Sequence, residues 1–299
     1  MIMNVLNTIG NTPMINLGMY GTPHIFAKAE HLNPGGSIKD RVALHLINTS
    51  EESGELKPGM TIMTATSGNT GIGVALVGGL KGYKVQVVMP ENMSEERKKI
   101  IRAFGGELIL TSAEGSLTES MDKVKSMQAA DDKIWVPRQF ENPGNPEAHY
   151  LTTAAEIWEQ MEGRVDAFVA GVGSGGTLSG VARFLKEKNP NVRIVAVEPK
   201  NSAALLGQEP GLHQIQGIGD GFIPPVLDVS LIDDVEVVTD EDAVLTSRAL
   251  ARKAGLLVGT SAGANVWAAN RVSHKPGGER RVVTILPDRA ERYFSTSLI

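Results

Sequence analysis

Cysteine is absent from the 299-residue chain. Its absence excludes disulfide bonds, zinc sites built on thiolates and a cysteine nucleophile supplied by the protein itself. Long apolar runs are missing as well, because no segment approaches the roughly 20 apolar residues that span a bilayer. The first lysine is Lys28, so the sequence lacks the charged start and the apolar run of a signal peptide. We therefore expect a soluble, cytoplasmic protein that does not enter a membrane.

Basic residues are not in excess either. The 29 lysines and arginines are outnumbered by 34 aspartates and glutamates, which gives a formal net charge of −5 at pH 7. Such a chain carries no basic field that would attract a phosphate backbone, so nucleic acid is not expected as a partner. The length allows two medium domains or one large α/β unit with a sizeable core.

Short β-branched runs alternate with helical patterns along nearly the whole chain. Several runs are apolar at consecutive positions, as in strands that are covered on both faces. Strands are expected at 24–30, 61–65, 84–89, 107–111, 134–137, 166–171, 192–198, 235–238 and 281–286. Helices are expected at 40–53, 70–82, 94–104, 117–129, 150–162, 178–188, 240–254 and 262–273.

This alternation predicts an α/β fold with mostly parallel, doubly wound sheets. A single eight-stranded barrel is the alternative, but the glycine-rich loops follow strands in two separate blocks. The sequence Asn-Pro-Gly-Asn-Pro at 142–146 predicts a domain boundary near residue 145. The glycine- and proline-rich segment 199–234 is too long for a simple connection and is typical of a functional or disordered loop.

One glycine-rich segment has the properties of a phosphate cradle. The sequence Val-Gly-Ser-Gly-Gly-Thr at 172–177 follows an apolar strand and opens a helix. Glycines let the backbone approach an anion, Ser174 and Thr177 add hydroxyl donors, and the helix N-terminus adds a positive dipole. The segment lacks the lysine of a P-loop and the spacing of a dinucleotide fingerprint, which disfavours an NTP or NAD. A tight turn without a ligand is the alternative.

Lys39 follows a second glycine turn, at the start of another predicted helix. The macrodipole disfavours a cation at that position, so a structural lysine gains little there. A lysine that must be neutral to form an imine does gain, because the positive helix end lowers its pKa. The alternative is a solvated lysine in a loop.

Two further segments place hydroxyl groups at helix starts. The run Thr66-Ser67-Gly68-Asn69-Thr70 follows a strand, suits a carboxylate and offers more donors than a helix cap needs. The segment Gly-Thr-Ser-Ala-Gly at 259–263 is weaker, since it serves equally well as a cap. A nucleophilic lysine, a phosphate cradle and a carboxylate cradle together fit pyridoxal phosphate, a phosphorylated aldehyde that condenses with amino acids.

With these motifs in place, the sequence resembles the cysteine synthase (O-acetylserine sulfhydrylase) and cystathionine β-synthase family of fold-type II pyridoxal-phosphate enzymes. The similarity runs over nearly the full chain, from Ile-Gly-Asn-Thr-Pro at 9–13 to Glu-Arg-Tyr-Phe-Ser-Thr at 291–296. The motifs that carry it are the run around Lys39, the stretch 66–71, the loop 173–177 and the sequence Ile-Gln-Gly-Ile-Gly at 215–219.

The resemblance implies a role for each matching residue. Lys39 would form the internal aldimine and later move the α-proton, and Asn69 would bond the phenolate oxygen of the cofactor. Ser261 would face the pyridine nitrogen, and its hydroxyl can leave that nitrogen unprotonated, which favours expulsion of a β-leaving group over transamination. The phosphate would lie on Gly173, Ser174, Gly175, Gly176 and Thr177. The substrate would be bound by Thr66, Ser67, Gly68, Thr70, Gln139 and Gly217.

The resemblance also implies an architecture and a reaction. The expected fold is tryptophan synthase β-like, with a larger cofactor-binding domain (1–39 and 146–299) and a smaller mobile domain (40–145) that closes over the substrate. The expected reaction forms L-cysteine from O-acetyl-L-serine, or a related β-substituted alanine, and sulfide through a bound aminoacrylate. Alternatives are replacement with homocysteine, and breakdown of cysteine with release of hydrogen sulfide. A homodimer and a serine acetyltransferase partner are also implied.

The chain departs from the family pattern at two positions. The family often has Gly-Met where this chain has Gly115-Ser116, and a small residue where it has Asp220. Both positions would lie near the incoming nucleophile. We hypothesise that Asp220 is a catalytic general base that widens the reaction beyond sulfide addition. The alternative is a solvated aspartate in an Asp-Gly turn.

Two other classes of function compete with this interpretation. A kinase or another nucleotide-binding enzyme of similar layered fold would need an acidic metal site beside the glycine loop, and the sequence offers none. A non-catalytic regulator that kept the fold is the other alternative, against which the intact Lys39 argues.

Overall fold

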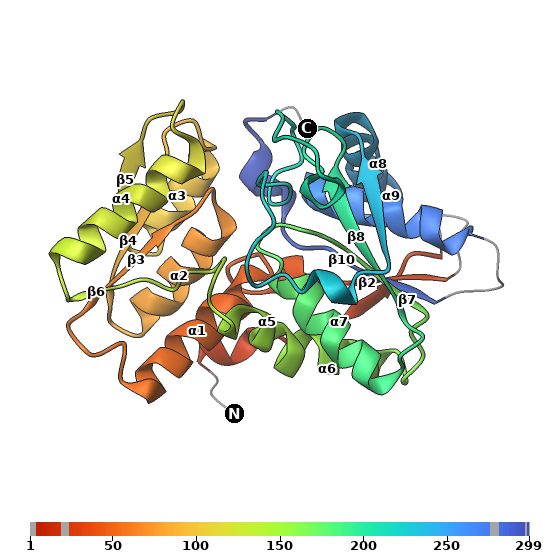
Figure 1. The fold of residues 1–299 in the computed structure, drawn as a ribbon, viewed down its shortest axis with the longest axis horizontal. Helices are drawn as coiled ribbons and strands as arrows, with labels where there is room; N and C mark the ends of the chain where they lie inside the picture. The colour runs from red at the N-terminus through yellow and green to blue at the C-terminus, as the bar shows by residue number, and fades with distance from the viewer. Residues whose placement is uncertain (1–3, 19–23, 276–280, 297, 299) are drawn as a thin grey trace.

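The computed structural model describes residues 4–18, 24–275, 281–296 and 298. Two sheets with helices around them form two lobes side by side (Figure 1). Within the described residues the larger sheet has the strand order β1-β2-β10-β7-β8-β9. Its strands are β1 (Met14–Asn16), β2 (Ile25–Lys28), β7 (Ala167–Gly171), β8 (Arg193–Pro199), β9 (Asp234–Val238) and β10 (Val282–Ile285). All neighbours pair in parallel except β1, which runs antiparallel to β2 at the edge.

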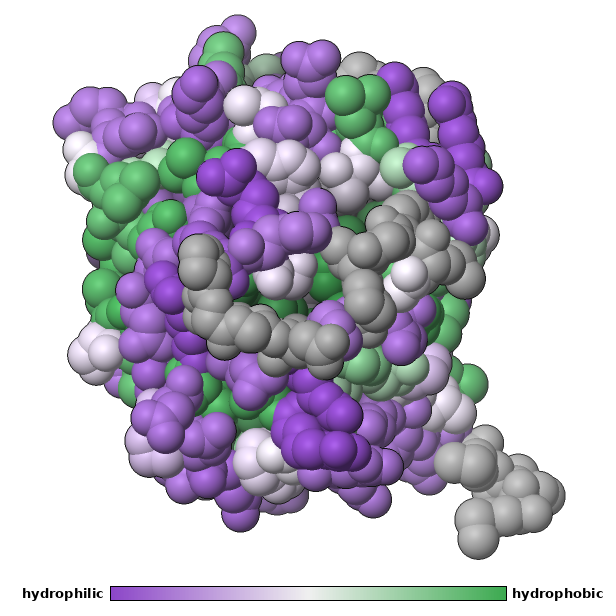
Figure 2. Space-filling view, turned by 90° about the vertical axis from the view of Figure 1, so that its right-hand side faces the viewer, coloured by the Kyte–Doolittle hydropathy of each residue, from purple (hydrophilic) through white to green (hydrophobic). Residues whose placement is uncertain are grey.

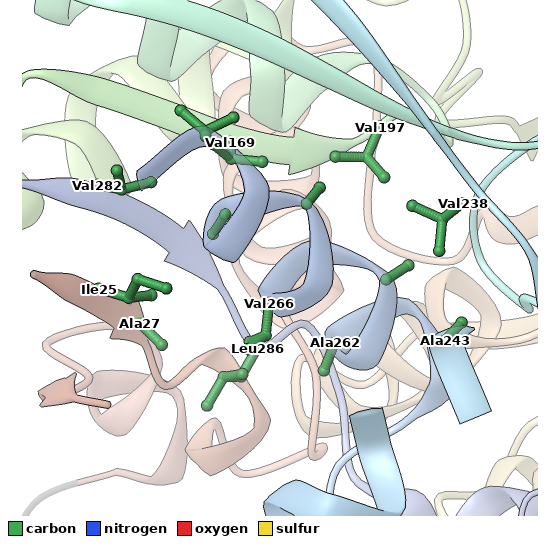
Figure 3. Packing of buried hydrophobic residues seen from close by; sticks show 14 of the residues in the cluster. Ile25, Ala27, Val169, Val197, Val238, Ala243, Ala262, Val266, Val282 and Leu286 are labelled. Atoms are coloured by element: carbon green, nitrogen blue, oxygen red, sulfur yellow. The ribbon is translucent and has the colours of Figure 1, made fainter. Parts of the chain in front are cut away.

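Helices cover both faces of this larger sheet. Because side chains alternate along a strand, Val169 of β7 points into one core and Phe168 into the other. The first core lies under α8 (Asp240–Ala254) and α9 (Thr260–Ser273), and Figure 3 shows α9 packed against Val169, Val282 and Ile25. The second core lies under α6 (Ala155–Gln160) and α7 (Gly176–Lys188). The consecutive apolar residues of these strands are therefore explained by burial on both sides.

The smaller sheet has the order β5-β4-β3-β6, and all its strands are parallel. It is built from β3 (Thr61–Ala65), β4 (Lys84–Pro90), β5 (Glu107–Thr111) and β6 (Ile134–Trp135). One face is covered by α1 (Lys39–Ser53), α2 (Asn69–Leu80) and α3 (Glu95–Ala103), and the other by α4 (Ser116–Ala130). Parallel strands in two open sheets confirm the predicted α/β, doubly wound fold and exclude a barrel. The division into domains at 40 and 145 stays a prediction.

Local structure differs from the sequence-based expectation in three places. The edge strand β1 was not expected, because its three residues are too few to show a periodicity. The helix expected at 150–162 starts as a π-helical turn over His149–Ala154 and continues as α6. The segment at 142–146, expected as a boundary, enters the short helix α5 (Gly144–Ala148).

A buried cluster of charges ties the start of the chain to α1 and α6. The Arg41 guanidinium binds the Glu30 carboxylate at 2.7 Å and the Glu156 carboxylate at 2.6 Å. Glu156 also binds the Lys28 ammonium at 2.6 Å, and neither Lys28 nor Glu30 has measurable exposed surface. Two positive and two negative groups therefore compensate one another in a largely buried position.

Arg41→Met should lower the free energy of unfolding by about 3–5 kcal/mol, because it leaves the Glu30 carboxylate buried without its partner. Urea unfolding followed by circular dichroism measures the loss. Arg164→Met is the control, since Arg164 pairs with Glu162 on the exposed surface and should matter little. Equal effects of the two substitutions would show that the buried cluster contributes no more to stability than an exposed ion pair.

The same cluster predicts a dependence of stability on acid. Although burial opposes ionisation, the hydrogen bond and charge of Arg41, with Lys28, lower the pKa of Glu156 from 4.5 to about 2. A carboxyl group whose pKa is lower in the folded state than in the unfolded state contributes its full stabilisation of the fold at pH values above its ordinary pKa. This contribution should therefore be lost as pH falls from 4.5 toward 2.

The face of the molecule drawn in Figure 2 is largely polar. Hydrophilic residues cover most of the face shown in Figure 2, with smaller hydrophobic areas among them. Within the described ranges, none of the helices combines the length and the apolar character needed to cross a membrane.

Candidate active site

A cleft opens where the carboxyl ends of β3 and β7 face each other, the position at which open parallel sheets bind ligands. Its walls come from segments that are far apart in the sequence. Thirteen of the residues singled out from the sequence line it: Lys39, Thr66, Ser67, Asn69, Thr70, Gln139, Gly173, Ser174, Gly175, Thr177, Gly217, Asp220 and Ser261.

Two of the singled-out glycines, Gly68 and Gly176, are not among the lining residues. The Gly68 N–H donates to Thr66 Oγ1 at 3.0 Å, and a Cβ at Gly68 would lie 2.4 Å from Arg97 Nε. A Cβ at Gly176 would lie 2.0 Å from Asn145 Oδ1. Gly176 is therefore required by the packing behind the cleft, and Gly68 by its close contact with Arg97.

Lys39 is the first residue of α1 and extends its amine into the cleft. The amine donates to Ser174 Oγ at 3.2 Å, and the ion pairs found among the described residues do not include it. Burial lowers the pKa of the Lys39 ammonium, and the Asp220 carboxylate opposes this change. The sequence had suggested the helix end as the cause, whereas burial is the main one. A lysine without a carboxylate partner and with a lowered pKa is suited to act as a nucleophile.

The glycine loop before α7 forms one end of the cleft. Gly175 has a left-handed φ of 81°, which a residue without a side chain adopts freely, and α7 starts directly after it. A Cβ at Gly173 would lie 2.3 Å from the carbonyl oxygen of Gly217, so the two loops touch through their backbones. The first N–H groups of a helix have no partner within the helix. Gly173, Ser174, Gly175 and Thr177 line the cleft at the start of α7, and such a helix start fits a phosphate group.

The loop before α2 forms the opposite wall. Thr70 Oγ1 donates to Gln139 Oε1 at 2.5 Å, which joins the loop to the segment that follows β6. Asn69 Nδ2 donates to Asp288 Oδ2 at 2.6 Å, and Arg292 Nη1 donates to Asn69 Oδ1 at 2.5 Å. The second hydrogen of the Asn69 amide is left for a ligand.

Asp220 and Ser261 occupy the remaining sides. Asp220 is exposed to solvent within the cleft. The surrounding protein nevertheless removes part of the water around its carboxyl group, which raises the pKa of that group, while the charges of Lys39 and His213 oppose the rise. Because water reaches the carboxyl group, it can exchange protons with solvent. Ser261 is buried at the start of α9, so a neutral hydroxyl, not a carboxylate, stands at this end.

Sequence reasoning missed two polar residues near the cleft. Arg97 lines it from α3, lies 4.9 Å over the Tyr293 ring and donates to Gln216, although its Nε has no partner. Its sequence context, Glu-Glu-Arg-Lys-Lys, is that of an exposed helix face and gave no signal. Asn145 is fully buried behind the loop at 173–177, where the sequence predicted a linker. Ser116 begins α4 next to Leu117, which lines the cleft.

Within the part of the chain that the structure describes, no three His, Asp or Glu side chains gather as metal ligands.

The fold and the cleft are those of a pyridoxal-phosphate-dependent enzyme. The chain belongs to the family of pyridoxal-phosphate-dependent enzymes, whose model matches residues 5–288. It is 46% identical to a cysteine synthase of Staphylococcus aureus over 299 residues, which are 99% of this chain and 96% of that protein. The structure of a cysteine synthase from Entamoeba histolytica superposes with a TM-score of 0.95 at 41% identity, covering 100% of this chain and 90% of that one. A hydrogen sulfide-producing enzyme from Fusobacterium nucleatum gives a TM-score of 0.93 at 41% identity, covering 98% and 100%.

Proposed function

We propose that this protein is a cysteine synthase, which forms L-cysteine from O-acetyl-L-serine and sulfide by replacement at the β-carbon. The observation that carries the proposal is the amine of Lys39, without a carboxylate partner, between a phosphate cradle and a carboxylate cradle in one cleft. The synthases from Staphylococcus aureus and Entamoeba histolytica support the choice of substrates.

The residues of the cleft fit the cofactor group by group. The N-terminus of α7 with Ser174 and Thr177 would hold the phosphate, and Ser261 would accept the pyridine end. Asn69 would donate to the phenolate oxygen through its free amide hydrogen. When bound, pyridoxal phosphate supplies the electron sink that makes the α-proton of the amino acid acidic.

The side chains around the amino acid would orient it and move its α-proton. Thr66, Ser67 and Thr70 offer hydroxyl and backbone donors to its carboxylate at the N-terminus of α2, and Gln139 fixes Thr70. Lys39, with its lowered pKa, would take the proton from the α-carbon. Acetate would leave from the β-carbon and hydrosulfide would add there, and return of the proton from Lys39 to the α-carbon would give cysteine.

Purified protein with added pyridoxal phosphate should show a visible absorption band, and it should turn over O-acetylserine with sulfide. Steady-state rates with O-acetylserine, serine and cysteine, each against sulfide, homocysteine and water, identify the reaction. A colourless protein that gains no band would refute the assignment.

A second candidate function is the breakdown of cysteine, and Asp220 favours it. A carboxylate in the cleft repels hydrosulfide, yet with its raised pKa it can accept a proton from water. In this reaction the bond from the β-carbon to sulfur breaks, water adds its oxygen there, Asp220 takes the water proton, and hydrosulfide leaves. The products are serine and sulfide. The resemblance to a hydrogen sulfide-producing enzyme supports this candidate.

Asp220→Asn should reduce the release of sulfide from cysteine by about 100-fold or more, because asparagine cannot accept a proton from water. Synthesis of cysteine from O-acetylserine should change by less than about threefold. Both rates are measured on the same preparation at matched cofactor occupancy. If both fall equally, or neither changes, Asp220 is only a turn residue.

The remaining expectations rest on the resemblance alone. We propose that the protein is a cytoplasmic homodimer that binds serine acetyltransferase. Light scattering of the purified protein tests the dimer, and co-purification with the acetyltransferase tests the complex.

A further inference from the structure

Asn145 lies directly behind the cleft, between its two ends. It belongs to the short helix α5, and its side chain has no exposed surface. On one side it contacts Gln139, which faces the substrate part of the cleft, and on the other Ser174, which faces the phosphate part. No role follows for it from the chemistry described so far.

The hydrogen bonds of Asn145 have a fixed direction. Its Nδ2 donates to the backbone carbonyl of Gln139 at 2.7 Å and to Ser174 Oγ at 2.9 Å. A carbonyl oxygen can only accept, so the group facing Gln139 must be the amide nitrogen. Both hydrogens of this nitrogen are then used, and Ser174 Oγ is an acceptor toward Asn145.

This direction decides where the Ser174 proton can point. One lone pair of Ser174 Oγ is occupied by Asn145, and Lys39 Nζ approaches the same oxygen at 3.2 Å as a second donor. The hydroxyl hydrogen is therefore turned away from Asn145, toward the cleft. A donor in that direction is what a phosphate group at the start of α7 requires.

The hydrogen bond from Asn145 to the Gln139 carbonyl holds the backbone on the substrate side of the cleft. Arg138, the preceding residue, has a left-handed φ of 48°, which is unfavourable for a residue with a side chain. The backbone at this point must be held by its surroundings, and Asn145 holds the carbonyl of Gln139. The Gln139 side chain in turn accepts from Thr70.

We propose that Asn145 is a positioning residue that orients the Ser174 hydroxyl toward the cofactor phosphate and, through the same nitrogen, fixes Gln139 for the amino-acid substrate. The inference rests on the proposed function for its substrate half. It assigns one buried amide to both ends of the site, so a single substitution should disturb cofactor and substrate binding together.

The test measures the dissociation constant of pyridoxal phosphate from apoprotein for wild type, Asn145→Ala, Ser174→Ala and the double variant. Asn145→Ala should weaken binding about tenfold, because the Ser174 proton loses its direction. In the Ser174→Ala background, the same substitution should change the constant by less than about threefold. An equal loss in both backgrounds, or no loss in either, would overturn the proposal.

Two further measurements separate positioning from a general loss of structure. At saturating cofactor, Asn145→Ala should raise the KM for the amino-acid substrate more than Ser174→Ala does, since only the first releases Gln139. Asn145→Asp keeps the shape of the side chain but presents an acceptor, so it should weaken cofactor binding more than alanine does. If Asn145→Ala does not fold, Asn145→Asp replaces it in the test. Wild-type affinity for the cofactor in Asn145→Asp would contradict the proposal.

Failure of the inference can be told from failure of the proposed function. Wild-type protein that never binds pyridoxal phosphate refutes the function itself. Wild-type protein that binds it, with variants that bind equally well, refutes only the role of Asn145.

Discussion

Lys39→Ala should lower turnover by at least about 1000-fold, because it removes a group that acts covalently and as a base. The amine is placed by the start of α1 and lies in the cleft. Since Lys39 makes no ion pair with a described residue, its loss should leave the fold intact. Rates with O-acetylserine and sulfide give the effect on activity, and urea unfolding gives the effect on stability.

The control for this prediction is Lys99→Ala, which removes an exposed lysine of α3 and should leave the rate unchanged. The visible band of the bound cofactor should also shift in Lys39→Ala, because a free aldehyde absorbs differently from an imine. Retention of more than a small fraction of the wild-type rate would refute the role assigned to Lys39.

Gly176→Asp should weaken the binding of pyridoxal phosphate by about 100-fold or more, since overpacking costs about 1–3 kcal/mol and like charges add to it. The first cause is the collision of the new Cβ with Asn145 Oδ1, 2.0 Å away. The second is the negative charge that the substitution adds to the first residue of α7, which opposes a phosphate at the same helix N-terminus although the side chain starts behind the cleft. Cofactor occupancy after dialysis, read from the visible absorbance, measures the loss.

Gly176→Ala separates the two causes, because it introduces the collision without the charge. Gly207→Asp is the matched control for charge at a distance from the cleft. A Cβ there meets nothing within 4 Å, and its left-handed φ of 74° is one that aspartate tolerates. Unchanged occupancy in Gly176→Asp would mean that the phosphate binds elsewhere.

The sheets were predictable because their strands are buried on both faces. Residues 166–171 and 192–198 contain apolar runs at consecutive positions, and they form the buried strands β7 and β8. The order of the strands was not predictable. It places β10 between β2 and β7, a pairing set by tertiary packing that no local pattern encodes.

The loops that line the cleft were predictable for a local reason. A phosphate or carboxylate bound at a helix start needs glycines and hydroxyls at fixed offsets, so the signal is contained in a few consecutive residues. Arg97 and Asn145 have no such signal, because each acts through partners that are distant in the sequence. The charge cluster around Arg41 was missed for the same reason: its members come from three separate segments.

The position of β2 between β1 and β10 has a consequence for biosynthesis. β2 (Ile25–Lys28) is synthesised long before its parallel partner β10 (Val282–Ile285), because most of the fold lies between them in the sequence. Until then one edge of β2 has no partner, and an unpaired edge invites association with other chains. Lys39 and Ser261 likewise meet only after Ser261 has been made. A nascent chain that has not reached this point lacks part of the cleft, and a chain terminated before β10 would be a substrate for chaperones and proteases rather than a partly active enzyme.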